Sequence, residues 1–316
     1  MSDAKTERII IALGGNAILT DDPSAGAQIR ALESTCEKIV PLIAAGNEVI
    51  ITHGNGPQVG NLLQQQEAAA SEANPAMPLD TCVAMTQGSI GYWTMLAMRG
   101  ALKRAGVKKL VQVLAMTATV DPEDTAFENP TKPIGPFYTE EQARQIMAEH
   151  PDQTYVEDSG RGWRRVVPSP EPVALPGCAG IEALVDAGIV VICTGGGGIP
   201  VIEDESGVRG VEGVIDKDLS AEKIAEAVDA DHLVICTGVD NVCVDFNKPT
   251  QRALTRVSVP ELEGYIDQGQ FPAGSMLPKI QGCMRFVQSG EGRRATITSL
   301  DCLSQLADGA GTTIVR

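Results

Sequence analysis

Four apolar runs that each end in a glycine-rich turn constrain the fold of this chain most strongly. They are IIIALGGN (residues 9–16), VIITHGNG (49–56), VVICTGGGG (190–198) and LVICTGVD (233–240). Continuous β-branched runs are typical of strands buried on both faces of a parallel sheet. A glycine after the strand end lets backbone N–H groups approach a ligand, and helices that begin after such turns attract phosphate. The four runs therefore predict one anion-binding crevice along a sheet edge.

The segments around these runs predict the other elements of an α/β fold. Residues 26–45 carry an amphipathic helical pattern that ends at Gly46, and another helix is expected after Pro57. Further helices are predicted over residues 85–105, 220–229 and 279–289, and further strands over residues 110–115, 295–300 and, as an edge strand, 309–315. Strands that alternate with helices indicate a mainly parallel sheet covered on both faces.

Residues 121–176 interrupt this alternation. They hold nine of the 19 prolines, a density that resists regular central strands. We interpret the stretch as an inserted subdomain of short strands and loops, with one helix over about residues 140–149. It could act as a lid or be a surface elaboration without function. A local basic set in this acidic chain favours the lid, namely Lys132, Arg161, Arg164 and Arg165.

The composition limits the class of partner and the cellular compartment. The chain has 25 Lys and Arg against 41 Asp and Glu, a formal net charge of −16, which disfavours nucleic acid or an anionic membrane as a general partner. No run approaches the ~20 apolar residues of a membrane span, and the polar start does not resemble a signal peptide. The eight cysteines include no CxxC pair, so we expect reduced thiols and a cytoplasmic location.

The motifs that bind metals or nucleotides most recognisably are absent. The three histidines are far apart, so no dedicated zinc site is expected. The P-loop pattern GxxxxGK[ST] does not occur, and no GxGxxG follows a strand with an acidic residue at the right distance. What remains is a glycine-lined crevice that needs cationic partners to bind an anion.

Two lysines near predicted strand ends are candidates for that role. Lys217 lies between Asp216 and Asp218 in VIDKDL, and Lys279 lies in GSMLPK. Each alone could be a solvated surface lysine. In phosphoryl transfer, however, the protein mainly positions anions and neutralises charge, so lysines and backbone N–H groups suit the task. Asp218 could hold both ammonium groups, or it could cap the helix that follows.

Seven motifs along the chain resemble those of the carbamate kinase family, in the amino acid kinase superfamily. In order they are LGGNA, THGNGPQVG, PTKPIGPFY, GRGWRRVVPSP, TGGGGIPV, VIDKDL and GSMLPK. The two motifs in the proline-rich insertion single out carbamate kinase within the superfamily. The resemblance spans nearly the whole chain and implies a three-layer αβα sandwich with a mainly parallel central sheet, a small protruding subdomain, and a homodimer.

The resemblance also implies an activity and assigns each substrate to one part of the chain. The activity is reversible phosphoryl transfer between ATP and carbamate, used mainly to make ATP from ADP and carbamoyl phosphate. Residues 1–215 would form an N-terminal lobe for carbamate or carbamoyl phosphate, including the lid at about 121–176. Residues 216–316 would form a C-terminal lobe for the nucleotide. Mg²⁺ would arrive with the nucleotide phosphates, since the chain offers no obvious carboxylate cage for a resident metal.

The same resemblance assigns roles to individual residues. The first two glycine turns would contact the transferring phosphoryl group, through Gly14, Gly15 and Asn16, and the carbamoyl group, through Gly54, Asn55 and Gly56. Lys217 and Lys279 would bridge the phosphates, with Asp218 orienting them. Lys132 would close over carbamoyl phosphate. The nucleotide would be bordered by Thr237, Gly238, Ser275 and Met276.

Some features leave alternatives open. Leu277 and Gly238 depart from residues common in the family or superfamily, and both lie on the expected nucleotide side. His53 could be a general base, but carbamate attacks through oxygen without deprotonation, so we expect a structural or hydrogen-bonding His53. A sibling kinase acting on an amino acid such as glutamate or acetylglutamate, and an inactive sensor that binds nucleotide or carbamoyl phosphate, remain as alternative functions.

Overall fold

The computed structural model describes residues 6–18, 22–158, 160–272 and 275–316, with the Asn16 side chain excepted. Its centre is an eight-stranded sheet in which neighbouring strands are parallel except for one antiparallel pair, β16 and β17. The strand order is β15 (Arg256–Ser258), β17 (Thr312–Val315), β16 (Arg294–Ser299), β12 (His232–Thr237), β1 (Arg8–Leu13), β2 (Glu48–His53), β9 (Val190–Cys193) and β3 (Val111–Leu114).

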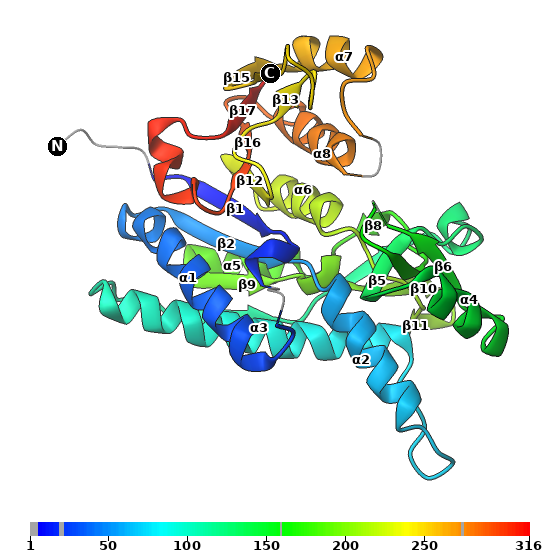
Figure 1. Ribbon diagram of the computed structural model, residues 1–316. Helices are drawn as coiled ribbons and strands as arrows, with labels where there is room; N and C mark the ends of the chain where they lie inside the picture. Colours follow the sequence, from blue (N-terminus) through cyan, green and yellow to red (C-terminus); the bar gives the residue numbers. More distant parts are fainter. Residues whose placement is uncertain (1–5, 19–21, 159, 273–274) are drawn as a thin grey trace.

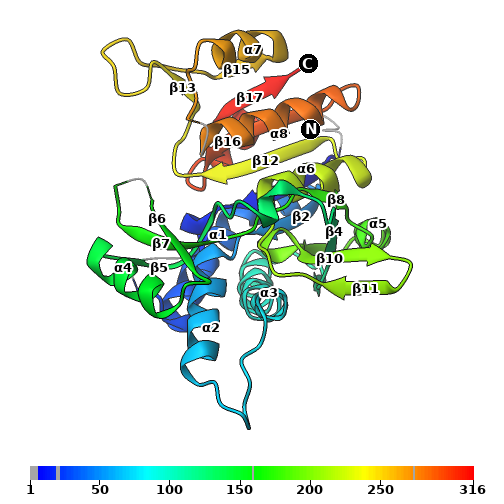
Figure 2. The ribbon, with the colours of Figure 1, turned by 90° about the vertical axis from the view of Figure 1, so that its right-hand side faces the viewer.

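Helices cover both faces of this sheet, which gives the predicted three layers (Figures 1 and 2). One face carries α1 (Ala25–Ala44) and α3 (Leu79–Arg104), and the other carries α5 (Cys178–Asp186), α6 (Lys217–Ala227) and α8 (Met276–Gln288). Strand β1 shows why both faces need cover. Ile9 and Ile11 are buried in the cluster with α1 and α3, whereas Ile10 is buried in the cluster with α6 and α8, as the two-residue period of a strand requires.

The proline-rich insertion forms a small unit that projects beside α2 (Gly56–Ala68), as Figure 2 shows. It contains the three-stranded sheet β5 (Lys132–Tyr138), β7 (Trp163–Val167) and β6 (Thr154–Glu157), and the helix α4 (Glu140–Glu149). We call residues 132–167 the protruding subdomain. The helix has the predicted bounds, and Thr139 and Gln142 form a capping box at its start. Strand β5 of the protruding subdomain packs on α2.

A second sheet was not predicted from the sequence. It joins β11 (Gly207–Gly210), β10 (Ile199–Asp204), β4 (Thr117–Val120) and β8 (Pro172–Ala174). The end of the predicted insertion, β8, therefore belongs to this sheet rather than to the protruding subdomain. The remaining elements are α7 (Val259–Asp267), the hairpin of β13 (Cys243–Val244) and β14 (Arg252–Ala253), and 3-10 turns at Gly15–Ala17, Thr125–Phe127, Gly195–Gly197 and Leu303–Asp308.

The predicted place of one strand in the sheet and the predicted starts of three helices are wrong. The C-terminal strand β17 is not an edge strand, because β15 pairs with it on its outer side. Three helices begin earlier than expected: α3 at Leu79, α6 at Lys217 and α8 at Met276. For α6 the reason is local, since the Asp216 side chain accepts a hydrogen bond from the backbone N–H of Asp218 and so starts the helix at Lys217.

Strands from the two sequence ranges predicted as lobes lie in opposite halves of the central sheet, and the division into lobes stays a prediction. Strands from residues 1–215 form the half with β1, β2, β9 and β3, and strands from residues 216–316 form the other half. The assignment of one substrate to each lobe stays a prediction. Within the described residues, no helix has both the length and the apolar character that crossing a bilayer requires.

Candidate active site

The carboxyl ends of β1, β2 and β12 open onto one cavity of about 270 Å³. Parallel neighbours place their ends at the same sheet edge, so segments far apart in sequence meet there. The predicted site residues that line it are Gly14, Gly15, Gly54, Asn55, Gly56, Lys132, Lys217, Asp218, Thr237, Gly238 and Lys279. The predicted role of the Asn16 side chain concerns atoms outside those the structure describes.

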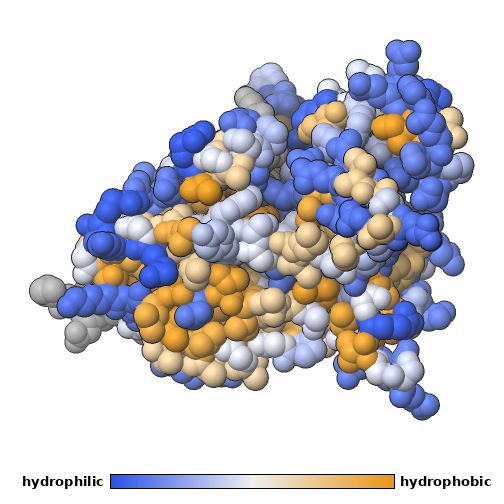
Figure 3. Space-filling view, turned by 90° about the horizontal axis from the view of Figure 1, so that it is seen from below, coloured by the Kyte–Doolittle hydropathy of each residue, from blue (hydrophilic) through white to orange (hydrophobic). Residues whose placement is uncertain are grey.

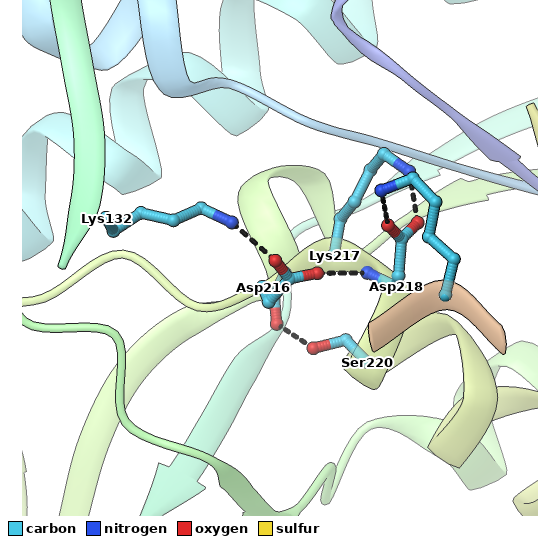
Figure 4. A network of polar contacts seen from close by, with 7 residues as sticks. Lys132, Asp216, Lys217, Asp218 and Ser220 are labelled. Atoms are coloured by element: carbon cyan, nitrogen blue, oxygen red, sulfur yellow. Dashed lines mark hydrogen bonds and ion pairs between the residues drawn. The ribbon is translucent and has the colours of Figure 1, made fainter. Parts of the chain in front are cut away.

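Asp218 holds two lysines together at the floor of this cavity (Figure 4). Its Oδ1 accepts from Nζ of Lys217, and its Oδ2 accepts from Nζ of Lys279 at 2.8 Å. Asp218 and Lys217 come from the first turn of α6, and Lys279 from the first turn of α8. Two helix N-termini therefore bring two ammonium groups onto one carboxylate.

The carboxylate of Asp218 and the ammonium group of Lys279 both stay charged. Burial alone would raise the pKa of the Asp218 carboxyl, but Lys217 and Lys279 hold it below its ordinary value. Burial likewise opposes the charge of Lys279, yet Asp218 raises the pKa of that ammonium above its ordinary value. Since two ammonium groups share one buried carboxylate, the floor of the cavity keeps an excess of positive charge for an incoming anion.

Asp216 links the protruding subdomain to the same cluster. Its Oδ1 accepts from the backbone N–H of Asp218, and its Oδ2 accepts from Nζ of Lys132 at 2.6 Å (Figure 4). Although burial opposes it, the charge of Lys132 holds the pKa of the Asp216 carboxyl well below its usual range. Asp216 was not predicted as a cap, because the helix was expected to begin only at residue 220. An aspartate shortly before a helical pattern was the signal that could have identified it.

Of the local basic set in the insertion, only Lys132 lines the cavity. Arg161 and Arg164 pair with Asp158 and lie over the Phe137 ring, and Arg165 pairs with Glu67 of α2 at 2.7 Å. The three arginines therefore stabilise the protruding subdomain and its contact with α2.

At two positions of the glycine turns, Gly14 and Gly196, the neighbouring atoms lie so close that a side chain would not fit. A Cβ at Gly14 would lie 2.8 Å from the carbonyl oxygen of Cys236, at the point where β1 and β12 end side by side. A Cβ at Gly196, in the turn after β9, would lie 2.2 Å from Nδ2 of Asn55, and its φ of +65° also favours glycine. Gly196 and Ile215 line the cavity and were not singled out as site residues from the sequence.

His53 lies behind the cavity wall. It is 1% exposed, its Nδ1 lies 3.0 Å from the carbonyl oxygen of Gly54, and it is absent from the cavity lining. Burial lowers the pKa of its imidazole to about 4. The ring is therefore neutral near pH 7 and packs against the turn after β9, in the structural position expected for it.

A second cavity of about 330 Å³ adjoins the first and shares Thr237, Gly238 and Lys279 with it. The predicted nucleotide residues Ser275 and Met276 line this second cavity. Its aromatic walls, Phe246 and Phe271, were not predicted from the sequence. Their presence in a chain with only five phenylalanines, next to prolines and turns, was the available signal. Apolar walls beside a cationic cluster suit a ligand with a flat base and phosphates.

The described side chains provide no ready-made metal site. Among them, no group of three or more His, Cys, Asp or Glu residues is placed to hold a metal ion. The two aspartates of the cavity, Asp216 and Asp218, already accept hydrogen bonds from lysines. This donor set fits an ion that is carried by a ligand's own phosphates better than one held by the protein alone.

Comparisons with known proteins agree with this geometry. The model of the amino acid kinase family matches residues 7–299. Carbamate kinase 1 of Enterococcus faecium is 54% identical over 301 residues, which cover 95% of this chain and 96% of that protein. Carbamate kinase of Lentilactobacillus hilgardii is 53% identical over 310 residues, with 98% and 97% covered.

Solved structures of carbamate kinases are also similar to this chain over nearly its whole length. Carbamate kinase from Giardia lamblia bound to citric acid superposes with a TM-score of 0.93 at 39% identity, and 98% of each chain is covered. The same enzyme bound to AMP-PNP gives a TM-score of 0.88 at 40% identity, again with 98% of each chain covered.

Proposed function

This chain belongs to the amino acid kinase family and is a carbamate kinase. From that premise we propose how the cavity at the lysine pair and the cavity that adjoins it divide the reaction between them. The 270 Å³ cavity binds carbamate or carbamoyl phosphate, and the adjoining 330 Å³ cavity binds the adenine nucleotide. The phosphoryl group passes at their junction, beside Lys279. The observation that carries this proposal is the pair of lysines on Asp218 at that junction.

The lysine pair provides the charge that the reaction needs. In phosphoryl transfer, negative charge is spread over the oxygens of the moving group while the donor and acceptor oxygens lie roughly in line. Lys217 and Lys279 neutralise this charge from two sides, and Asp218 fixes both ammonium groups so that they need no rearrangement during the transfer. In the main direction of the proposed reaction, the enzyme makes ATP from ADP and carbamoyl phosphate.

The glycine turns supply hydrogen-bond donors around the same group. Gly14 and Gly15 follow β1, and Gly54 and Gly56 follow β2. Their backbone N–H groups bind the phosphoryl and carbamoyl oxygens, and α2, which begins at Gly56, adds the positive end of its dipole. The absence of side chains at these positions allows the substrate to approach the backbone.

The nucleotide base lies among the apolar residues of the second cavity, which include Val239, Phe246, Phe271 and Met276. The Giardia lamblia relative solved with AMP-PNP, at 40% identity, supports an adenine nucleotide as the ligand. Mg²⁺ enters as part of the metal–nucleotide substrate and neutralises charge on its phosphates. Gly238 lines this cavity, so it is the position through which nucleotide affinity would differ from that of relatives, whereas Leu277, next to Met276 at the start of α8, packs against the hydrophobic core.

Two further proposals concern assembly and location. Met85, Tyr92 and Leu96 of α3 are 41%, 53% and 42% exposed and recur along one stripe of the helix. Figure 3 shows apolar residues gathered on the face of the molecule where α3 lies. Such a patch fits self-association, and we assign the homodimer contact to this stripe. The cytoplasmic location stays the prediction made from the cysteine pattern.

The proposal is tested by the Asp218→Asn variant. Asparagine keeps the shape of the side chain but removes the charge that fixes both lysines. We expect ATP formation from ADP and carbamoyl phosphate to fall about 100-fold or more while the protein stays folded. Wild-type turnover in a folded Asp218→Asn variant would contradict the proposed role of the lysine pair, and ligand-induced stabilisation of the wild type without turnover would indicate a sensor.

A further inference from the structure

The side chain of Asn55 is turned away from the helix that it begins. Asn55 is the N-cap of α2, yet it makes no side-chain capping hydrogen bond. Asparagine at this position usually accepts a bond from the first turn of its own helix. Here its Nδ2 instead donates to Oγ1 of Thr86 in α3, at 2.9 Å. A residue of a different helix therefore sets the direction of this amide.

The Thr86 hydroxyl also determines which way round the amide lies. It donates its one proton to the backbone carbonyl oxygen of Val83, at 2.7 Å, and that oxygen can only accept. Oγ1 of Thr86 can therefore only accept from Asn55, so the atom facing it must be the amide nitrogen. The atom that Asn55 has left to offer a ligand is its carbonyl oxygen, an acceptor.

Gly196 packs against the amide as well. A Cβ on this residue would lie 2.2 Å from Nδ2 and 2.6 Å from Oδ1 of Asn55. Asn55 and Thr86 are each 2% exposed. The amide is therefore packed between α3 and the glycine turn after β9, and its orientation is fixed before any substrate binds.

An acceptor at this place matters because of what a carbamoyl group contains. Its amino nitrogen carries two N–H donors, and its lone pair is delocalised, so it needs acceptors. The glycine turns offer backbone N–H donors, which suit the carbonyl and phosphoryl oxygens instead. Among the described side chains of the cavity, acceptor oxygens belong to Asn55, Asp216, Asp218 and Thr237, and lysines already occupy both aspartates.

We propose that Thr86 is a positioning residue that sets the specificity for the carbamoyl group. By holding the Asn55 amide with its oxygen available, Thr86 lets Asn55 accept a hydrogen bond from the carbamoyl N–H. Acetyl phosphate has a methyl group in the place of that amino group and would leave the acceptor unpaired, which a site built for a hydrogen bond penalises. This inference rests on the proposed function of the 270 Å³ cavity.

The test compares carbamoyl phosphate with acetyl phosphate as phosphoryl donors to ADP. In Thr86→Val, which removes the hydroxyl but keeps the shape, the amide can turn. The ratio of kcat/KM for carbamoyl phosphate to that for acetyl phosphate should then fall about 10-fold, through loss of one hydrogen bond. Thr86→Ser keeps the hydroxyl and should retain the wild-type ratio, a rescue that a purely structural role would not produce.

Asn55→Ala provides the second arm. It removes the acceptor itself and should lower the ratio as far as Thr86→Val does, and the double variant should fall no further, because Thr86 acts through Asn55. An unchanged ratio in folded Thr86→Val, or in Asn55→Ala if Thr86→Val does not fold, would overturn the inference alone. A folded wild type that makes no ATP from carbamoyl phosphate would instead overturn the proposed function, and this inference with it.

Discussion

The ammonium nitrogen of Lys132 lies 2.6 Å from Oδ2 of Asp216. The pair joins strand β5 of the protruding subdomain to the N-cap of α6, whose next two residues are Lys217 and Asp218. A residue of the insertion thus reaches the cluster of Asp216, Lys217 and Asp218 across 84 positions of sequence. The contact places Lys132 at the 270 Å³ cavity, as the proposed function requires.

The first prediction concerns Lys132. If it closes over carbamoyl phosphate, Lys132→Ala should raise the KM for carbamoyl phosphate about 10- to 100-fold, the value of a hydrogen bond to a charged group. The KM for ADP should change much less, because Lys132 does not line the nucleotide cavity. Initial-rate kinetics with each substrate varied in turn would measure both, with the exposed Lys108→Ala as control. Equal losses for the two substrates would contradict the assignment.

The contact between α2 and the protruding subdomain gives a second prediction. A Cβ at Gly60 would lie 2.0 Å from the backbone nitrogen of Gly135, so Gly60→Ala must push β5 and Lys132 away from α2. We expect a lower melting temperature and a higher KM for carbamoyl phosphate. Gly264 in α7 has nothing within 4 Å of its Cβ position, so Gly264→Ala should keep the KM and gain up to about 1 kcal/mol of stability. Unchanged kinetics in Gly60→Ala would show that the subdomain does not position Lys132.

The apolar stripe of α3 gives a third prediction. A charge at the centre of a self-complementary contact meets its own copy across the two-fold axis, which repels. Tyr92→Glu should therefore shift the protein from dimer to monomer in sedimentation velocity at micromolar concentration. Leu110→Glu is the matched control, because Leu110 is 66% exposed but lies outside the stripe, before β3. A wild type that sediments as a monomer, or a Tyr92→Glu variant that stays dimeric, would remove this stripe as the dimer contact.

Two buried imidazoles make the acid limb of stability predictable. Burial lowers the pKa of His53 to about 4 and that of His232 to about 3, from the ordinary 6.5. As the pH falls below 6.5, these two histidines bind protons in the unfolded chain but stay neutral in the folded protein. The free energy of unfolding therefore falls toward pH 4. Burial raises the pKa of the Glu222 carboxyl to about 7, which opposes part of this slope, but the two histidines together outweigh it, so urea midpoints from pH 7 to pH 4 should decline.

Single histidine variants show which side chain causes the fall in the free energy of unfolding between pH 7 and pH 4. His53→Gln should make the decline shallower, whereas His150→Gln, at an exposed position, should leave it as in the wild type. The depressed pKa values of Asp216 and Asp218 act in a lower window, because a carboxylate with a lowered pKa loses its stabilising effect only below its ordinary value of 3.8. An equal slope in His53→Gln and the wild type would mean that the pKa of His53 is not lowered in the folded state.

Much of the fold could be predicted because it is encoded locally. Continuous apolar runs followed by glycine mark β1, β2, β9 and β12, since burial on both faces requires the first and close approach to a ligand the second. The shared cavity follows from the parallel arrangement of these strands. The pairing of Lys217 and Lys279 on Asp218 was likewise foreseen as one of two options, because few other cations lie next to strand ends.

The features that escaped prediction depend on distant parts of the chain. Strand β15 has three residues, and only its pairing with β17 makes it a strand. Strands β4 and β10 form a second sheet through a parallel pairing across about eighty residues, which no local pattern records. Thr86 contacts Asn55 across 31 positions, and within α3 it resembles any buried threonine.

Formation of ATP from ADP, Mg²⁺ and carbamoyl phosphate in a coupled assay tests the central claim most directly, with Lys217→Ala beside the wild type. Lys223→Ala, on the same helix but outside the cavity lining, is the control. The account predicts robust turnover in the wild type and in Lys223→Ala, and a loss of about 100- to 1,000-fold in Lys217→Ala. Wild-type turnover in a folded Lys217→Ala protein would contradict the claim that the lysine pair on Asp218 carries the phosphoryl transfer.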